Sequence, residues 1–441
     1  MMSNNISDYQ VFFGCSDFSG LFRGRAVSSN EYKKKLATGC GWVPADQSLT
    51  PFGEIGPSNP FGSLGDLRLI PDTKAEYKIT CAETITPFHF FMCDIYDLDG
   101  SPWNCCARDY LKKGINLLNK KYGLLLKIGF EHEFTVIDPD QLSEPVFSMR
   151  AFRKEEKFIT ILAHCLNEAN IIAENFLPEY GTNQFEVPTS AKPPLTAADD
   201  AVALREIIKE VSRATSKKIS LSPKLTPDSV GNGVHIHLSL ENKNGVNISQ
   251  DKGQKGGLSK QFSAFFAGVL DHIDSVTALS APSSISYLRL KPHNWSASYN
   301  TISIQDREAA IRICPEIRSK SGQLGTFHGE VRVGDATASP YLHLGSIIHA
   351  GLIGLEKNLE ITHLTDSDPS QMTGKERKLL GLRRLPKSLK EAIESLSSDK
   401  TFKESAHKLF WDCYEDMRKT ELEFTKKMTE KNLCNAYKDI F

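Results

Sequence analysis

Short apolar runs separated by turn-forming residues make up the first hundred positions of the chain. Residues 77–80 and 90–95 have the extended pattern of strands, and the segments around them are rich in Gly, Pro, Ser and Phe. Strands bounded by such clusters are typical of small sheets. A further turn cluster at 97–102 precedes the first helical pattern, so we predict a strand-rich domain over residues 1–104.

Beyond this boundary, long segments with a helical spacing of apolar residues alternate with short strand-like runs. The first predicted helix covers residues 107–122 and ends near Gly123. The other helical patterns lie at 149–176, 196–217, 261–279, 342–359, 387–396 and 401–431. We predict a second, larger domain over residues 105–441.

The strand-like runs of the larger domain have one apolar face and one ionisable face. In the run 124–137, Glu131 and Glu133 share a face because strand side chains alternate with a period of two. Three further runs show the same pattern, carrying Gln184 and Glu186, then His235, His237 and Ser239, then Glu330 and Arg332. Taken alone, each run also fits a solvated strand face.

Together these polar faces form a candidate metal site. Carboxylates gathered in one place repel one another unless cations lie between them. Oxygen ligands with a single imidazole suit Mg²⁺ or Mn²⁺ better than Zn²⁺. The candidate ligands are Glu131, Glu133, Glu179, Glu186, His235 and Glu330.

Four arginines accompany the acids, and we predict strand-like contexts for Arg289, Arg307, Arg312 and Arg332. Guanidinium groups match carboxylates and phosphates, and arginines beside two hard cations suit phosphoryl transfer from a nucleotide. The chain has no Gly-x-x-x-x-Gly-Lys-Ser/Thr motif, so a P-loop does not hold the nucleotide. Surface ion pairs are the alternative interpretation.

Composition and charge narrow the class of protein further. Lys and Arg number 53 against 54 Asp and Glu, so no basic surplus favours binding to nucleic acid or to an anionic membrane. The first five residues do not resemble a targeting segment, and no window of about 18 apolar residues occurs. We expect a cytoplasmic protein that acts on small molecules.

Ten cysteines are spread along the chain without a Cys-x-x-Cys pair. In a chain without a secretory segment, this spacing favours neither a disulfide framework nor a zinc knuckle. We predict reduced, buried thiols.

The stretches at 130–134, 179–186, 231–240, 286–290, 306–313 and 330–342 resemble, in this order and spacing, signatures of the glutamine synthetase family. The resemblance implies an α+β fold, with a small β-grasp domain followed by a large domain whose antiparallel strands form a funnel with helices outside. It also implies a homo-oligomer of stacked rings, with each active site between neighbouring subunits.

The resemblance further implies an ATP-dependent ligase that phosphorylates the γ-carboxylate of glutamate and lets an amine displace the phosphate. Two Mg²⁺ or Mn²⁺ ions would be held, one by Glu133, Glu179 and Glu186 and the other by Glu131, His235 and Glu330.

The resemblance also implies roles for residues that contact the substrates. The loop beginning at Gly231 would lie along glutamate, and Arg289 would bind its α-carboxylate. Ser239 and His237 would lie near ATP. The arginines expected around the phosphoryl group and glutamate are Arg307, Arg312 and Arg332.

Two departures from the family pattern concern the amine. Trp295 stands where ammonia-using members carry a flap glutamate, and residues 52–64 contain no counterpart of the aspartate that helps deprotonate ammonium. An aromatic side chain suits a bulkier alkylammonium. The chain therefore resembles most closely the branch that makes γ-glutamyl amides from organic amines, such as γ-glutamylpolyamine synthetases.

Alternatives to this interpretation remain open. Ammonia-using glutamine synthetase is the first, and a non-catalytic structural or sensing relative is the second. Three further departures are Val230 in the glutamate loop, and Gly325 and His328 where the family often has Lys and Arg beside ATP.

Overall fold

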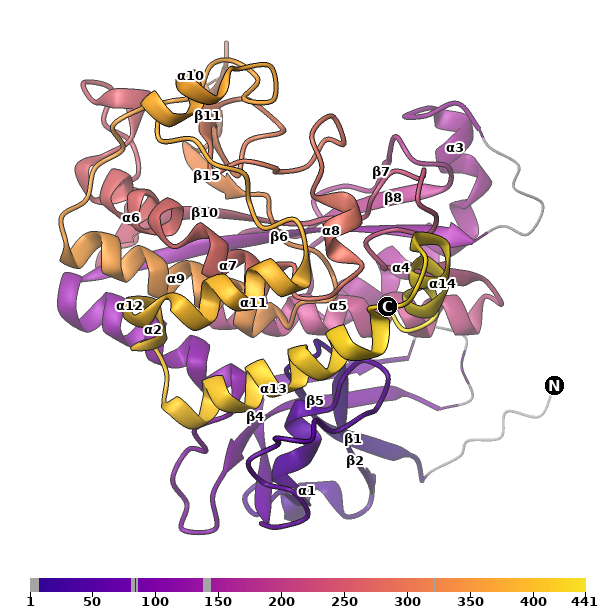
Figure 1. The fold of residues 1–441 in the computed structure, drawn as a ribbon. Helices are drawn as coiled ribbons and strands as arrows, with labels where there is room; N and C mark the ends of the chain where they lie inside the picture. The colour runs from indigo at the N-terminus through magenta and orange to yellow at the C-terminus, as the bar shows by residue number, and fades with distance from the viewer. Residues whose placement is uncertain (1–7, 81–83, 85, 138–143, 321) are drawn as a thin grey trace.

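The computed structural model describes residues 8–80, 84, 86–137, 144–320 and 322–441. The first five residues, which we compared with targeting segments, lie outside these ranges. So does Cys81, one of the thiols predicted to be reduced and buried. A small sheet and a large sheet dominate the molecule, and helices lie between and beside them (Figure 1).

The small sheet contains five strands in the order β2-β1-β5-β4-β3. The central strands β1 and β5 are parallel, whereas the other neighbours are antiparallel. The elements are β1 (Gln10–Ser16), β2 (Phe22–Ser28), α1 (Tyr32–Lys35), β3 (Cys40–Trp42), η1 (Pro44–Ser48), β4 (Leu67–Ile79) and β5 (Phe88–Tyr96). This is the β-grasp arrangement that we predicted, and position 104 falls between β5 and the next helix.

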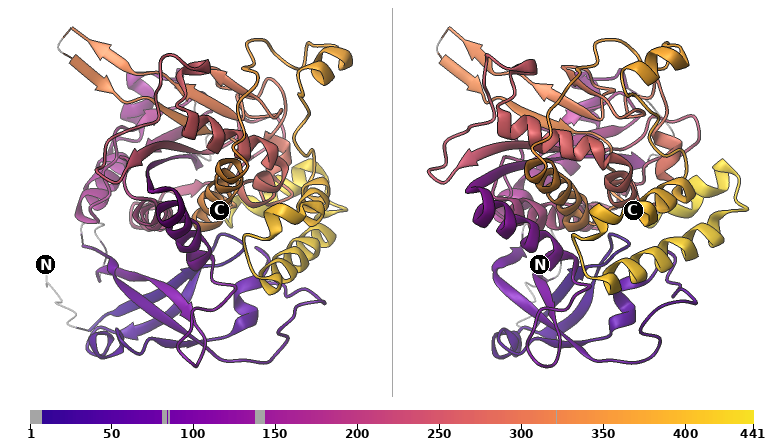
Figure 2. Two further views of the ribbon diagram at one scale, coloured as in Figure 1. Left: turned by 90° about the vertical axis from the view of Figure 1, so that its left-hand side faces the viewer. Right: turned by 60° about the vertical axis from the view of Figure 1, so that its left-hand side comes forward.

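The large sheet runs in the order β11-β12-β15-β10-β6-β8-β7, and β9 also pairs with β6. Its neighbours are antiparallel except β11 and β12, which are parallel. The strands are β6 (Leu124–Ile137), β7 (Leu177–Pro178), β8 (Gln184–Pro188), β9 (Lys218–Ser220), β10 (Val234–Asn242), β11 (Ile302–Ile304), β12 (Ile311–Cys314) and β15 (His328–Val331). A separate hairpin of β13 (Ile317–Ser319) and β14 (Gly322–Gly325) projects from the body (Figure 2).

The helices of the larger domain agree with the sequence pattern best where one apolar face is continuous. Helix α2 has the predicted bounds. The helices are α2 (Ala107–Tyr122), α3 (Met149–Lys154), α4 (Glu156–Glu168), α5 (Pro194–Ala214), α6 (Lys260–Asp271), α7 (Ile273–Ser280), α8 (Ser286–Arg289), α9 (Pro340–Glu356), α10 (Gly374–Leu379), α11 (Leu389–Ser398), α12 (Lys400–Lys403), α13 (Lys408–Thr425) and α14 (Glu430–Lys438), with a 3₁₀ turn η2 (Lys255–Gly257).

Three predicted helices are each divided in the structure. The segment 149–176 holds α3 and α4 and ends at Glu168, because Asn170 adopts a left-handed φ of 57° that a helix cannot continue through. The pattern at 261–279 is interrupted at His272, and that at 401–431 covers all of α13 together with parts of α12 and α14. Among the helices described, none is long and apolar enough to span a bilayer.

Helix α9 is the centre of the helical layer. It is apolar around nearly its whole circumference and packs against α2, α5, α6 and α7, as expected for a helix buried on all sides. Helices α2 and α5 contact both β6 and strands of the small sheet, so they separate the two sheets (Figure 1). The face of the large sheet that points away from these helices carries the polar residues.

Two buried arginines tie the small sheet to the larger domain. The Arg108 guanidinium on α2 donates to Asp199 of α5, and also to Asp72 and Asp94 of the small sheet at 2.8 and 3.0 Å. On α13, Arg418 pairs with Glu421 and donates to the Phe18 carbonyl oxygen at 2.7 Å. Both side chains are almost fully buried, so these bonds join the domains in a protected environment.

Replacing Arg108 by lysine should lower the free energy of unfolding by about 2 kcal/mol, because one ammonium group cannot serve the buried Asp199 and the partly buried Asp72 and Asp94 at once. Urea titration followed by circular dichroism measures this change. The matched control is Arg213→Lys, whose exposed pair with Glu210 should contribute less than about 0.5 kcal/mol. Equal losses in the two variants would contradict the proposed anchor.

Candidate active site

The polar face of the large sheet gathers acids and imidazoles from four neighbouring strands. Residues directly opposite in adjacent strands point to the same face. The registers pair Glu133 with Glu186, Glu131 with His235, and His237 with Glu330. Phe130 and Phe134 of β6 are fully buried, so the alternation along this strand places Glu131 and Glu133 away from the helices.

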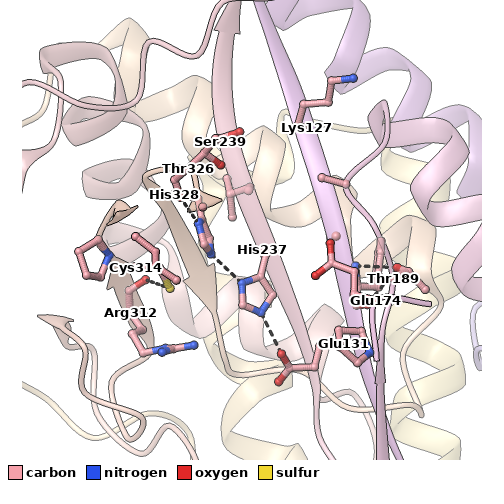
Figure 3. A pocket seen from close by; sticks show the side chains of 18 of the residues that line it. Lys127, Glu131, Glu174, Thr189, His237, Ser239, Arg312, Cys314, Thr326 and His328 are labelled. Carbon is pink, nitrogen blue, oxygen red and sulfur yellow. Dashed lines mark hydrogen bonds and ion pairs between the residues drawn. The ribbon is translucent and has the colours of Figure 1, made fainter. Parts of the chain in front are cut away.

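Two cavities meet at this cluster. The larger, of about 1050 Å³, is lined by His237, Ser239 and Arg312 among others (Figure 3). The smaller, of about 290 Å³, is lined by residues that include Glu133, Glu179, Gly231, Arg289, Trp295 and Arg332. Three residues line both cavities, namely Glu131, Glu186 and Arg307.

The structure brings together the predicted trio of Glu131, His235 and Glu330. His235 Nδ1 lies 2.7 Å from Glu131 Oε1 and 3.6 Å from Glu330 Oε1. Although burial opposes ionisation, hydrogen bonds from His235 and His237 hold the pKa of Glu131 well below its ordinary value. Burial and the nearby Arg332 guanidinium lower the pKa of His235 to about 4, so this imidazole is neutral and able to act as a ligand.

The second predicted trio lines the smaller cavity. Burial, followed by the neighbouring carboxylates, raises the pKa of Glu133 to about 8 and that of Glu186 to about 10. Burial likewise raises the pKa of Glu179, whose carboxylate accepts a hydrogen bond from the Tyr180 backbone N–H. A divalent cation would relieve this repulsion, and carboxylate oxygens are its preferred ligands, so the residues fit Mg²⁺ or Mn²⁺.

Potential ligand atoms lie within 4.8 Å of one another in groups that differ from the two predicted trios. One group is Glu131, Glu133 and His235, and another is Glu131, His237 and Glu330. Glu131 thus lies between the two parts of the cluster. His237, which the family resemblance placed near ATP, is also close to the acids, with Nε2 3.0 Å from Glu131 Oε2.

Arg289 is held rigidly at the floor of the smaller cavity. Its Nη2 donates to the carbonyl oxygens of Val333 and Gly334 at 2.9 and 2.7 Å. Its Nε is buried and has no hydrogen-bond partner among the described residues. A Cβ atom at Gly231 would lie 2.5 Å from Arg289 Cγ, so only glycine permits this close approach.

The strand-like context predicted for Arg289 is wrong, because it ends the four-residue helix α8. Four alternating residues are too few to distinguish a strand from a buried helical turn. Arg312 lies in β12 as predicted, whereas Arg307 precedes β12 and Arg332 follows β15.

Two of the three predicted phosphoryl-binding arginines contact Glu330, and the third contacts one of them through its backbone. The side chains of Arg312 and Arg332 both form ion pairs with this buried carboxylate. Arg332 Nε also donates to the Arg307 carbonyl oxygen at 2.8 Å. Burial opposes ionisation of Glu330, but Arg332 and His237 lower its pKa to about 2, so this acid remains charged.

Trp295 lies on an exposed loop at the smaller cavity. Its side chain is 61% exposed, which excludes a role in the core. The backbone has a left-handed φ of 52°, unusual for a bulky residue, and its N–H donates to Glu308 Oε1 at 3.0 Å. Glu308 also accepts from the His293 N–H at 3.2 Å, so one carboxylate fixes the loop that carries the indole.

The aspartate-free stretch at 52–64 lies elsewhere. Phe52 stacks on Phe424 of α13 and contacts Tyr437 of α14, with ring centroids 4.4 and 5.0 Å apart. None of the residues 52–64 lines either cavity of its own chain.

The sequence did not indicate the roles of two further residues of the site, Gln184 and Cys314. Gln184 Nε2 donates to the Gly231 carbonyl and to Asn232 Oδ1, both at 2.9 Å, and so supports the glutamate loop. Cys314 is free and buried, as predicted for the thiols, but it also lines the larger cavity; burial opposes ionisation, yet His237 and His328 lower its pKa to about 7. The other cysteines described are also free, and Cys40 alone among these nine is not buried.

A signal for Cys314 was present in the sequence. Arg312 and Cys314 are two residues apart in one strand and therefore share a face. The register that pairs Cys314 with His328 could not be read from the sequence.

Comparisons with known proteins agree on one family. The family profile described as "Glutamine synthetase, catalytic domain" matches residues 104–437, and that described as "Glutamine synthetase N-terminal domain" matches residues 8–103. The γ-glutamylpolyamine synthetase GlnA3 of Streptomyces coelicolor is 29% identical over 96% of this chain and 91% of its own. The glutamine synthetase of Thermococcus kodakarensis is 30% identical, covering 94% and 92%.

Solved structures show the same fold. A crystal structure described as a novel glutamine synthase homologue superposes with a TM-score of 0.90 at 35% identity, covering 98% of both chains. A complex of GmaS with ADP superposes with a TM-score of 0.79 at 22% identity, covering 96% of this chain and 95% of that one.

Proposed function

Because the chain belongs to the glutamine synthetase family of ATP-dependent ligases, we propose that it joins the γ-carboxylate of glutamate to an organic primary amine. The observation that carries the proposal is the exposed indole of Trp295 at the wall of the smaller cavity, beside the carboxylate cluster. The amide would form through γ-glutamyl phosphate.

Each of the two cavities would hold a different substrate. Ser239 and His237 line the larger cavity, where ATP would lie, and Arg289 lines the smaller cavity, where glutamate would lie. The phosphoryl group would pass between them at the shared wall, where Arg307 faces both sides. Two divalent cations would be held by Glu133, Glu179 and Glu186 and by Glu131, His235 and Glu330. Bound there, they supply positive charge that neutralises the phosphate oxygens.

The chain's own residues would bind and orient the reactants. Arg289 Nε, a buried donor without a partner in the part of the chain that the structure describes, would bind the α-carboxylate, and the anchored Nη2 fixes the direction of the guanidinium. A free carboxylate is a poor electrophile, whereas an acyl phosphate is a good one. The amine nitrogen then bonds to the γ-carbonyl carbon as the carbon–oxygen bond to phosphate breaks, with loss of a proton from nitrogen.

Trp295 supports an organic amine over ammonium. An indole face attracts an alkylammonium and covers its methylenes, whereas ammonium presents only N–H groups that need nearby acids. The S. coelicolor relative, which is a γ-glutamylpolyamine synthetase, supports the same class of substrate.

We also propose that the protein assembles into rings with sites between subunits. Residues 52–64 line neither cavity of their own chain, which supports their placement at a neighbour's site. Equilibrium sedimentation would measure the assembly.

At saturating ATP and glutamate, we expect kcat/KM for at least one organic amine to exceed that for ammonium by about tenfold or more. Each buried methylene contributes about 0.8 kcal/mol, so two or more of them against the indole account for this factor. Initial rates of phosphate release with ammonium, methylamine, ethanolamine, putrescine and spermidine measure it.

Two variants sharpen this comparison. Trp295→Glu places a carboxylate where ammonia-using members carry one and should move the preference toward ammonium. Leu379→Ala removes an apolar side chain that is 86% exposed on α10 and should leave the preference unchanged. Ammonium as the best acceptor of the unaltered protein would overturn the proposed amine specificity.

A further inference from the structure

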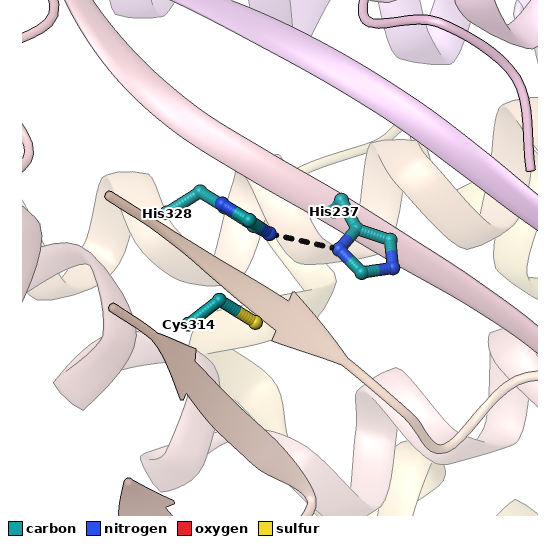
Figure 4. Close-up of side chains that lie close together, drawn as sticks. All are labelled: His237, Cys314 and His328. Carbon is teal, nitrogen blue, oxygen red and sulfur yellow. Dashed lines mark hydrogen bonds between the residues drawn. The ribbon is translucent and has the colours of Figure 1, made fainter. Parts of the chain in front are cut away.

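Beside the carboxylate cluster, two imidazoles and a thiol converge on the larger cavity. His237 lies on β10, Cys314 ends β12 and His328 begins β15 (Figure 4). His237 Nδ1 and His328 Nε2 are 3.0 Å apart, and one ligand atom from each of the three residues lies within 4.8 Å of the others.

In each imidazole ring, the nitrogen that points away from the other ring already has a hydrogen-bond partner. His328 Nδ1 lies 2.8 Å from the Thr326 carbonyl oxygen, which can only accept, so Nδ1 carries the hydrogen and the Nε2 lone pair faces the cluster. His237 Nε2 lies 3.0 Å from Glu131 Oε2, which likewise accepts. Outer hydrogen bonds to carbonyl and carboxylate oxygens are how proteins orient metal-binding histidines.

The spacing of the inner atoms suits a tetrahedral ion. Zinc bonds to nitrogen of about 2.0 Å at tetrahedral angles place two nitrogens about 3.3 Å apart. The 3.0 Å pair reaches this separation by a shift of a few tenths of an ångström, with loss of the proton now shared between the rings. Two imidazoles and a thiolate are soft ligands that prefer Zn²⁺ to Mg²⁺, unlike the oxygen-rich cluster nearby.

We propose that His237, Cys314 and His328 bind one Zn²⁺ ion whose fourth position faces the larger cavity. All three residues line that cavity, so the ion has an entry path and room for a water or an anionic ligand (Figure 3). The site differs from the two carboxylate sites in its ligands and in its preferred metal. One of its ligands, His328, stands at a position where the glutamine synthetase family often has a basic residue beside ATP.

Bound zinc would affect the nucleotide. This consequence rests on the proposed function, because it takes the larger cavity as the place of ATP. An ion at the cavity wall changes the charge and shape that the phosphates meet, so we expect Zn²⁺ to raise the apparent Kd for ATP. The binding of zinc itself does not depend on that assignment.

Isothermal titration of the full chain with Zn²⁺ in excess Mg²⁺ tests the site directly. We expect one Zn²⁺ per chain, and at least about 100-fold weaker binding in Cys314→Ser, because serine replaces the only sulfur ligand. His328→Gln, at a partly exposed position, should show the same loss if the cysteine variant folds poorly. Cys40→Ser, a partly exposed thiol of the small domain, is the matched control and should bind zinc like the unaltered protein.

Cobalt provides an independent readout. Co²⁺ bound by a thiolate gives a charge-transfer absorption band that oxygen ligands do not give, and this band should disappear in Cys314→Ser. Equal zinc affinity in Cys314→Ser and the unaltered chain, or Co²⁺ binding without the thiolate band, would overturn the proposal. Because neither measurement uses glutamate or an amine, the outcome is separate from that of the ligase assay.

Discussion

Replacing Glu131 by glutamine should lower phosphate release by at least about 100-fold in the presence of Mg²⁺, ATP, glutamate and an accepted amine. Glu131 lines both cavities and accepts hydrogen bonds from two histidines. Glutamine keeps the size of the side chain but removes the negative charge that would hold a cation. Steady-state assays of the purified variant measure the loss.

Metal binding, measured independently of turnover, should also change in the Glu131 variant. We expect weaker binding of Mn²⁺ to Glu131→Gln, measured by electron paramagnetic resonance of the free ion, and the same direction of change in His235→Ala. Glu360→Gln, an exposed acid beyond the end of α9, is the matched control and should behave like the unaltered protein. Unchanged turnover in a well-folded Glu131 variant would disprove the metal assignment.

Replacing Arg289 by lysine should lower kcat/KM for glutamate by about 30-fold, which corresponds to about 2 kcal/mol. Burial lowers the pKa of this guanidinium although the Asp335 and Glu133 carboxylates oppose that shift, so an arriving carboxylate would stabilise the buried charge further. Lysine keeps the charge but cannot bond to two backbone carbonyls and a ligand with one planar group. Initial rates over a range of glutamate concentrations measure the effect.

The kinetics for ATP distinguish this role from a general loss of structure. The KM for ATP should change less than threefold or so, since Arg289 lines only the smaller of the two cavities. Arg383→Lys, at an exposed pair with Asp274, is the matched control. Normal glutamate kinetics combined with a large loss of ATP binding would show that the assignment is wrong.

The sequence predicted those parts of the structure in which a regular period extends over many residues. Helix α2 and strand β6 have the bounds that the pattern indicated, and the alternation along β6 placed Glu131 and Glu133 on one face. Regular alternation over fourteen residues leaves little ambiguity, because a shift of one residue would bury the acids and expose the aromatic side chains.

Features that depend on contacts between distant segments could not be read in this way. Arg289 lies on a short helix whose orientation is fixed by carbonyl oxygens some forty residues later. Cys314 and His328 meet only through the register of β12 and β15. The position of Trp295 depends on Glu308, thirteen residues away, which holds a loop of left-handed backbone.

The two buried arginines that join the domains, Arg108 and Arg418, affect how the molecule unfolds locally as well as how stable it is. Arg108 and Arg418 each bond from a helix of the larger domain to the small domain, and neither bond can break without leaving a buried group unpaired. Local detachment of the small domain is therefore costly. Slow amide protons of both sheets should exchange with solvent through one shared opening event, so the two domains behave as a single cooperative unit.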